Sequence, residues 1–233
     1  AEEAAELRAA GAPCEIVPGV TSAFAAPAYA GVSPTIRRVA SSIHIFTAQG
    51  AADRDSEVIE WARAAQMGGT LIFMMGFGRI GEIAAQLIAH GIDPATPAAV
   101  VQWGTTPSQR QAFSRLDRLE AAATEAGLGS PAVIAIGQAA AEEQRVPWMD
   151  ALPLFGLSVA FTRDERRATP WLEACEDLGA RVFDFPLVAT EPSDPGAEGR
   201  RAFERLGEYD WIVFANSLGV ETFFDWLSAN GAD

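Results

Sequence analysis

Two adjacent hydroxyl side chains, Thr21 and Ser22, follow a Pro18-Gly19 turn and open a predicted helix. Thr and Ser are favoured at helix starts, because their oxygens accept hydrogen bonds from the first unpaired amides of the helix. Such a helix end also presents backbone N–H groups and a hydroxyl to a polar ligand. The turn is therefore a candidate ligand site of unspecified chemistry.

A glycine-rich turn follows the predicted strand Thr70–Met75 and opens the next helix, since Gly76-Phe77-Gly78-Arg79-Ile80-Gly81 fits the pattern G-x-G-x-x-G. A dinucleotide site would also need an acidic residue at the end of the next strand, to bind the ribose. That strand, Ala98–Gln102, ends in a glutamine. A nucleotide-dependent oxidoreductase that uses this turn remains an alternative function, as does a noncatalytic folded fragment.

A third polar segment, Trp103-Gly104-Thr105-Thr106-Pro107-Ser108-Gln109-Arg110, follows the same strand. Gly104 allows a close approach of the backbone, and two hydroxyls and an amide come after it. The segment suits a ligand-binding turn, and an ordinary polar connection between strands is the other interpretation.

Strands alternate with helices along the chain, which predicts an α/β protein. Helices are expected over residues 1–10, 22–29, 56–66, 80–90, 116–126, 170–178 and 220–227, with one more ending near 206. Strands are expected over residues 14–17, 42–47, 70–75, 98–102, 109–114, 131–137, 157–161, 181–185 and 211–214. Pro147, Pro153 and Gly156 interrupt the pattern and predict a linker.

The composition excludes several classes of protein. The formal net charge is −14, which argues against binding to nucleic acid or to an anionic membrane. The basic residues are all arginine, so these 233 residues supply no Schiff-base lysine. With two cysteines, two isolated histidines and no long apolar run, we expect a cytoplasmic protein without a metal site or a membrane span.

Four segments together resemble the tetrapyrrole methyltransferases, which use S-adenosylmethionine: Glu15–Ala23, Thr70–Gly76, Ala99–Arg110 and Pro131–Gly137. The run WGTTPSQR is similar to a signature of the uroporphyrinogen-III C-methyltransferases. The resemblance implies a class III methyltransferase fold, an α/β domain with a mixed sheet. It also implies cofactor contacts, which fall on Thr21, Ser22, Met75, Gly104 and Ala132.

The same resemblance implies the reaction, which is two C-methylations of uroporphyrinogen III to precorrin-2 for sirohaem or cobalamin synthesis. Arg37 and Arg110 are candidate contacts for the substrate carboxylates, although Ile36 stands where the family usually has histidine. The family is dimeric, so a homodimer is expected. The family's acid/base residues would precede Ala1, and we therefore expect a fragment that is inactive alone.

Beyond the linker, Pro153–Arg163 and Tyr209–Phe214 resemble the first part of a uroporphyrinogen-III synthase, a lyase with a flavodoxin-like module. The chain departs from many synthases at Ala215–Val220, where hydroxyl and amide groups are displaced or lost. The expected organisation is the end of an N-terminal methyltransferase domain at 1–20, a C-terminal methyltransferase domain at 21–145, a linker at 146–156 and a partial synthase module at 157–233.

Overall fold

The computed structural model describes residues 2–48, 59–163, 165–189, 191 and 193–230. The chain divides into two compact units, and each is described by itself. The first unit comprises Ala1–Phe161 together with Thr169–Asp184, and the second comprises Thr162–Ala168 together with Phe185–Asp233.

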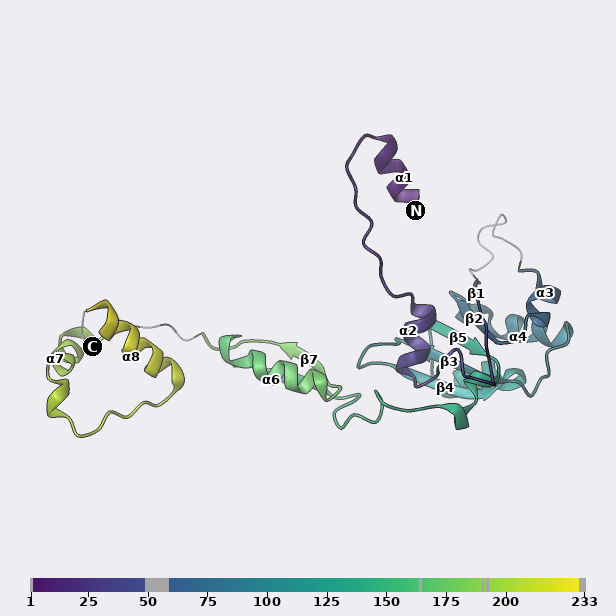
Figure 1. The fold of residues 1–233 in the computed structure, drawn as a ribbon. Coiled ribbons are helices and arrows are strands. Elements are labelled where there is room, and N and C mark those ends of the chain that lie inside the picture. The colour runs from purple at the N-terminus through teal and green to yellow at the C-terminus, as the bar shows by residue number, and fades with distance from the viewer. Residues whose placement is uncertain (1, 49–58, 164, 190, 192, 231–233) are drawn as a thin grey trace. The chain divides into compact units, whose positions relative to one another are not determined.

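A five-stranded mixed sheet forms the centre of the first unit (Figure 1). Its strands are β1 (Ile43–Thr47), β2 (Thr70–Met74), β3 (Pro97–Gln102), β4 (Arg110–Arg115) and β5 (Ala132–Ile136), and they lie in the order β1-β2-β5-β3-β4. The strands β1 and β2 are parallel, whereas β5 runs antiparallel to both β2 and β3, and β4 runs antiparallel to β3. The mixed sheet expected from the sequence is confirmed.

Helices cover both faces of this sheet. Successive residues of a strand point to opposite faces, so each strand supplies apolar side chains to both helical layers. On one face Leu71, Phe73, Val100 and Ile134 pack with residues of α3 (Trp61–Gln66), α4 (Ile80–Ala89) and α5 (Leu119–Glu125). On the other face Ile72, Ala99, Val101 and Val133 pack against alanines of α2 (Ser22–Tyr29). Among the described residues, the sheet therefore carries a large core on one side and a smaller cluster, formed with α2 and Ala140, on the other.

The N-terminal part of the chain follows the expectation only partly. The helix α1 (Glu2–Ala9) forms and ends before Gly11, which has a φ of 72°. The strand expected at Cys14–Val17 is wrong: that segment has no strand pairing among the described residues, and Val17 is 81% exposed. For the helix expected at 56–66, residues 56–58 lie outside the described residues, and α3 begins at Trp61.

Short helical turns and a small sheet follow β5. The 3-10 helices η3 (Gln138–Ala140) and η4 (Glu142–Gln144) lead into the expected linker. Two parallel strands, β6 (Ser158–Phe161) and β7 (Arg181–Asp184), pair with each other. The helix α6 (Glu165–Asp177) connects them, in agreement with the expected βα pattern.

The second unit contains α7 (Gly196–Glu204), the 3-10 helix η5 (Leu206–Glu208) and α8 (Ser217–Ala229). Five of its aromatic residues form one cluster of ring contacts: Phe203, Phe214, Phe223, Phe224 and Trp226. The rings of Phe203 and Trp226 stack with centroids 3.9 Å apart. The strand expected at Trp211–Phe214 is wrong: the segment has no strand pairing among the described residues, and Trp211 is 85% exposed.

Candidate ligand site

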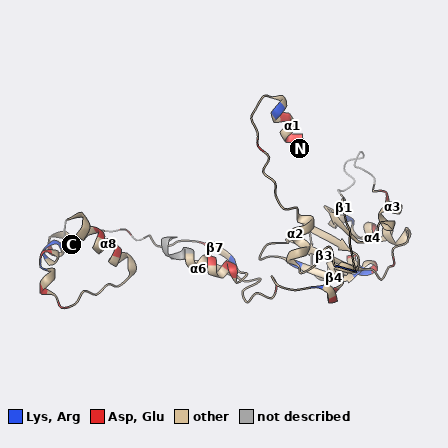
Figure 2. Cartoon of the chain, viewed as in Figure 1, with Lys and Arg blue, Asp and Glu red and all other residues tan. Residues whose placement is uncertain are grey.

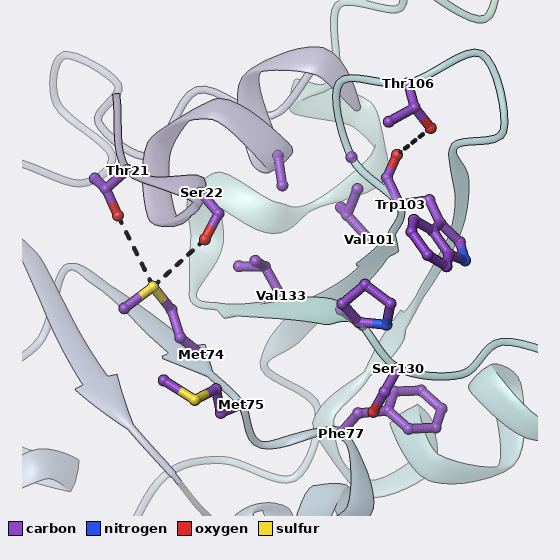
Figure 3. Close-up of a pocket in the computed structure, with 14 residues that line it drawn as sticks. Thr21, Ser22, Met74, Met75, Phe77, Val101, Trp103, Thr106, Ser130 and Val133 are labelled. Carbon is purple, nitrogen blue, oxygen red and sulfur yellow. Dashed lines mark hydrogen bonds between the residues drawn. The ribbon is translucent and has the colours of Figure 1, made fainter. Parts of the chain in front are cut away.

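A cavity of about 660 Å³ lies between the N-terminal end of α2 and the ends of β2, β3 and β5 (Figure 3). Ligand pockets in proteins commonly have volumes of about 300–1,000 Å³. Its lining comes from separate parts of the chain: Thr21, Ser22, Ala26, Met74, Met75, Phe77, Val101, Trp103, Gly104, Thr106, Ser130, Pro131, Ala132 and Val133.

The N-terminal end of α2 brings two hydroxyls to this cavity. The backbone of Thr21 is extended, with φ −67° and ψ 142°, and its Oγ1 accepts a hydrogen bond from the amide of Ala23 at 3.3 Å. The hydroxyls of Thr21 and Ser22 both point to the sulfur of Met74, at 3.9 and 3.6 Å (Figure 3). A thioether is a weak acceptor, so a ligand with a stronger acceptor can replace it.

Two strands end at the cavity in an unusual backbone conformation. Met75 follows β2 with φ 54°, and Trp103 follows β3 with φ 51°. Positive φ is costly for residues with large side chains, and such residues gather at functional sites where the surrounding structure holds them. Both side chains are exposed, Met75 by 61% and Trp103 by 49%. The strand ends thus present a thioether and an indole to the cavity.

The turn after β3 is held by hydrogen bonds around the carbonyl of Trp103. That oxygen accepts from the amide of Thr106 at 3.2 Å and from its hydroxyl at 2.8 Å. The amide of Trp103 donates to the carbonyl of Pro131 at 3.2 Å, which ties the turn to the start of β5. The amide of Thr105 donates to Oε1 of Gln109 at 3.1 Å. The turn is therefore fixed on both sides before any ligand arrives.

The cavity is electrically neutral. None of its fourteen lining residues, which all lie in the described part of the chain, has an ionisable side chain. The helix α2 carries no charged residue either, as its uniform tan colour shows in Figure 2. Such a lining is suited to hold and orient a ligand through hydroxyls, backbone groups and apolar walls.

An ion pair at the start of α4 follows the cavity-lining residue Phe77 in the sequence. Nε of Arg79 donates to a carboxylate oxygen of Glu82 at 2.9 Å. This hydrogen bond lowers the pKa of Glu82 below its ordinary value of 4.5 and raises the pKa of Arg79. Neither residue lines the cavity, so the pair belongs to the structure of the helix end.

The sequence-predicted cofactor residues meet in one place. Thr21, Ser22, Met75, Gly104 and Ala132 all line the cavity, although they lie far apart in the sequence. Sequence reasoning did not single out Phe77, Trp103 or Ser130, which line it as well. Trp103 could have been found from the sequence, because an indole stands out in an otherwise polar turn. The segment around Ser130 contains no comparable signal.

The two predicted substrate contacts, Arg37 and Arg110, are not among the lining residues. The guanidinium of Arg110 donates to the carbonyls of Ala126 and Gly127, where α5 ends, with 3.0 Å to Gly127. Arginine near a helix C-terminus interacts favourably with its unpaired carbonyls. Arg37 is exposed. Their contact with substrate carboxylates stays a prediction.

The glycine-rich turn has a structural explanation in this fold. A Cβ atom on Gly76 would stand 2.8 Å from Cδ1 of the buried Ile83 and 3.2 Å from the Cβ of the buried Ala48, so glycine allows the turn to pack closely against the core. The strand β5 lies between β2 and β3, antiparallel to both. The turn therefore does not begin the βαβ unit with neighbouring parallel strands that a dinucleotide fold uses.

The two histidines make local contacts. Nε2 of His44 lies 3.2 Å from the hydroxyl of Ser42, and Nδ1 of His90 lies 2.7 Å from the carbonyl of Gln86. Within the described ranges, no group of three or more His, Cys, Asp and Glu residues gathers where a metal could bind. In the same ranges, no helix has the length and apolarity that a membrane crossing requires.

Two different families match separate parts of the chain. Residues 1–120 match the family described as tetrapyrrole (corrin/porphyrin) methylases. Residues 170–233 match the family described as uroporphyrinogen-III synthase HemD.

Two relatives align with almost the whole chain. The porphyrin biosynthesis protein HemD of Ruminiclostridium josui is 34% identical over 221 residues, which cover 95% of this chain and 44% of the relative. A uroporphyrinogen-III C-methyltransferase of Bacillus subtilis (strain 168) is 32% identical over 232 residues, which cover 100% of this chain and 47% of the relative. The chain thus spans less than half the length of these two relatives.

A solved structure shares the fold of the first unit. The native form of uroporphyrin III C-methyl transferase from Thermus thermophilus has a TM-score of 0.51 and is 29% identical to this chain. The match covers 62% of this chain and 61% of that protein. The class III methyltransferase fold expected from the sequence is therefore confirmed.

Proposed function

Because the chain belongs to the tetrapyrrole methylase family, we propose that it is part of an enzyme that methylates uroporphyrinogen III on carbon. The methyl donor is S-adenosylmethionine, and the product is precorrin-2, a precursor of sirohaem and cobalamin. The observation that carries this proposal is the meeting of Thr21, Ser22, Met75, Gly104 and Ala132 along one cavity.

The cavity suits the size and chemistry of the donor. A nucleoside with an amino-acid chain has polar edges and apolar faces, and the lining offers both kinds of contact. Thr21 and Ser22 supply hydroxyls, whereas Met75 and Trp103 supply exposed apolar surface. A neutral lining is also compatible with a sulfonium, since no buried cation opposes it.

When bound, S-adenosylmethionine supplies an electrophilic methyl group on a positively charged sulfur. The residues of this chain contribute position: α2 and the turn after β3 hold the ligand from two sides, and Trp103 and Phe77 shield it from water. Orientation within a dry cleft can supply a large part of the acceleration of a displacement reaction. Each methylation also requires the loss of a proton. The cavity lining holds no side-chain base for that step.

The acceptor carries eight carboxylates, so its recognition calls for cations. Arg37 and Arg110 are the proposed contacts, and local fields rather than the net charge of −14 decide such binding. Support for Arg110 comes from its place in the WGTTPSQR segment, beside the turn that lines the cavity.

The second part of the chain is proposed to belong to a uroporphyrinogen-III synthase module, with a lyase activity in a bifunctional parent protein. Its support is the family match over residues 170–233. The proposed boundaries are 1–20 and 21–145 for the two methyltransferase domains, 146–156 for the linker and 157–233 for the synthase module. A homodimer and a cytoplasmic location complete the proposal, and both rest on the family resemblance and the composition.

Titration calorimetry with S-adenosylhomocysteine and with NADH tests the cofactor. The chain is expected to bind S-adenosylhomocysteine saturably and to show no heat with NADH. The variant Ser22→Ala should weaken binding, whereas Ser33→Ala should not, because the Ser33 hydroxyl donates locally to the carbonyl of Thr35 at 2.8 Å. Binding of NADH without binding of S-adenosylhomocysteine would overturn the proposal in favour of an oxidoreductase. A folded, dimeric chain that binds neither ligand would favour the noncatalytic alternative.

A further inference from the structure

The segment Arg145–Asp150, at the start of the expected linker, is fastened to the C-terminal end of α2. Nε of Arg145 donates to the carbonyl of Ala30 at 2.7 Å, and the amide of Val146 donates to the carbonyl of Gly31 at 2.8 Å. Nε1 of Trp148 donates to the carbonyl of Ala28 at 2.9 Å. The last carbonyls of a helix lack their usual partner four residues further on, so these donors bind carbonyls at and just beyond the helix end. The carbonyl of Ala28 also accepts from the amide of Gly31 at 3.0 Å.

The close approach at this point leaves no room for a larger residue. Gly31 has a φ of 79°, and a Cβ atom on it would stand 2.5 Å from the carbonyl oxygen of Val146. The indole of Trp148 also packs edge-on against the ring of Tyr29, with centroids 4.7 Å apart. The segment is therefore part of the first unit's structure and holds one end of the helix whose other end lines the cavity.

Asp150 joins this segment to the edge strand β4. Its carboxylate pairs with Arg145, and its Oδ2 also accepts from Nε2 of Gln111 at 2.9 Å. The guanidinium of Arg145 lies over the ring of Phe113, 5.2 Å from the centroid. The side chains of Arg145 and Asp150 are only 16% and 21% exposed. Removal of one partner of such a shielded pair is costly, because it leaves the other charge uncompensated.

From Gln111 the hydrogen bonds continue to the cavity. Oε1 of Gln111 accepts from Nε2 of Gln109 at 3.1 Å, and Oε1 of Gln109 accepts from the amide of Thr105 at 3.1 Å. Gln109 is buried, with 3% of its surface exposed, so its amide needs these partners. Thr105 has a φ of 72° and sits in the turn that carries Trp103, Gly104 and Thr106.

We propose that Asp150 is a positioning residue for the cavity, acting on both of its walls. Through Arg145 it holds the C-terminal end of α2, and through Gln111 and Gln109 it holds the strained turn after β3. The segment after the methyltransferase domain thereby controls the shape of the ligand site. The identity of the ligand rests on the proposed function, whereas the control of the turn does not.

Amide hydrogen exchange of Thr105, measured by NMR on the 233-residue chain without ligand, tests the control of the turn. The variant Gln111→Met removes the link in the middle of the network, and Asp150→Ala removes both branches. Both should make exchange at Thr105 about tenfold faster, with amides of the central strands β2 and β5 unchanged. Asp150→Asn keeps an acceptor for Gln111 and should leave Thr105 close to the wild-type rate.

Titration with S-adenosylhomocysteine tests the effect on the site. Asp150→Ala and Gln111→Met should each weaken binding by about threefold to tenfold, the loss typical of one or two hydrogen bonds. The double variant should be little worse than Asp150→Ala, because the two residues act in one network. Asp117→Asn is the matched control, since it breaks the exposed pair of Asp117 with Arg115, which joins no residue of this network.

Two results would overturn this proposal. One is unchanged Thr105 exchange in Gln111→Met. The other is an effect of equal size at Thr105 and in the central strands, which would indicate general destabilisation. Failure of the wild-type chain to bind S-adenosylhomocysteine would count against the proposed function instead, and the exchange experiment would still decide the role of Asp150.

Discussion

Gly104 lies so close to Ala26 of α2 that a Cβ atom on Gly104 would stand 2.4 Å from the Ala26 Cβ and 2.8 Å from its Cα. These atoms are the Cα of the helix backbone and the Cβ bonded to it, which cannot move aside as the end of a flexible side chain does. Glycine at this position therefore sets the distance between the two walls of the cavity.

The variant Gly104→Ala should push α2 away from the turn. Overpacking of this kind costs about 1–3 kcal/mol, and the displaced helix should also weaken binding of S-adenosylhomocysteine. Chemical denaturation and calorimetry measure the two effects. Gly78→Ala is the matched control, because a Cβ atom on Gly78 would meet no atom within 4 Å. Equal stability of the two variants would contradict the close contact.

Thr21 has two functions that substitution can separate. Thr21→Ala removes the oxygen that accepts from the amide of Ala23, and loss of such a cap typically costs about 1 kcal/mol. Thr21→Ser keeps a hydroxyl and should preserve both stability and ligand affinity. Denaturation curves and S-adenosylhomocysteine titrations of the two variants check this. If Thr21→Ala is as stable as the wild type, the assignment of Thr21 as N-cap is wrong.

Trp103 should matter more for binding than for folding. Its indole is 49% exposed, so Trp103→Ala should change the melting temperature little. An aromatic wall contributes apolar area and ring contacts to a bound nucleoside, so the same variant should lose affinity for S-adenosylhomocysteine. Trp103→Phe should keep most of the affinity. Wild-type affinity in Trp103→Ala would show that the ligand does not contact the indole.

The pair of Arg79 and Glu82 should give a pH-dependent contribution to stability. The pKa of Glu82 is lower in the folded protein than its ordinary value of 4.5, so the pair stabilises the fold above that value. The stabilisation is lost as the pH falls through the lowered pKa. Because the carboxylate is half-exposed, the pair contributes at most about 0.5 kcal/mol to the free energy of unfolding at neutral pH.

The difference in melting temperature between the wild type and Glu82→Gln, followed from neutral pH downwards, measures this contribution. The difference in melting temperature should be small and constant at neutral pH and should disappear at acid pH. A difference that persists below the lowered pKa would show that the substitution acts through packing instead of through the charge.

The strands of the five-stranded sheet could be predicted because each has a strong local sequence pattern. Thr70–Met75 is a continuous apolar run, and the structure buries most of it between two helical layers. The sequence predicts a helix that begins at Ser22, with Thr21 or Ser22 as its cap, and ends near Tyr29, and α2 spans Ser22–Tyr29 with Thr21 as its N-cap. These signals are local, and local signals can be read from sequence.

The two wrong strands show where local signals fail. Cys14–Val17 and Trp211–Phe214 have the apolar, β-branched and aromatic composition of strands. A strand is stable only when its backbone groups are paired with a neighbour, however, and the described residues supply no neighbour to either segment. Composition indicates the preference of a segment, whereas pairing depends on distant parts of the fold.

The linker could be predicted only as a change of pattern. Pro147, Pro153 and Gly156 interrupt the regular elements, but they do not reveal that Arg145 and Trp148 bind the end of α2. That contact joins residues more than a hundred positions apart. The candidate cavity was predicted through a family resemblance for the same reason, because its walls meet only in the folded chain.

The strand β5 has a consequence for the order in which the first unit forms during synthesis. It is the last of the five strands in the sequence, yet it lies between β2 and β3, with Val133 opposite Met74 and Ala132 opposite Gln102. Until Ala132–Ile136 leaves the ribosome, β2 and β3 each keep an unpaired edge, which is a hazard for aggregation. The floor of the cavity is thus completed late, and a nascent chain that stops before Ala132 should need a chaperone to stay unaggregated.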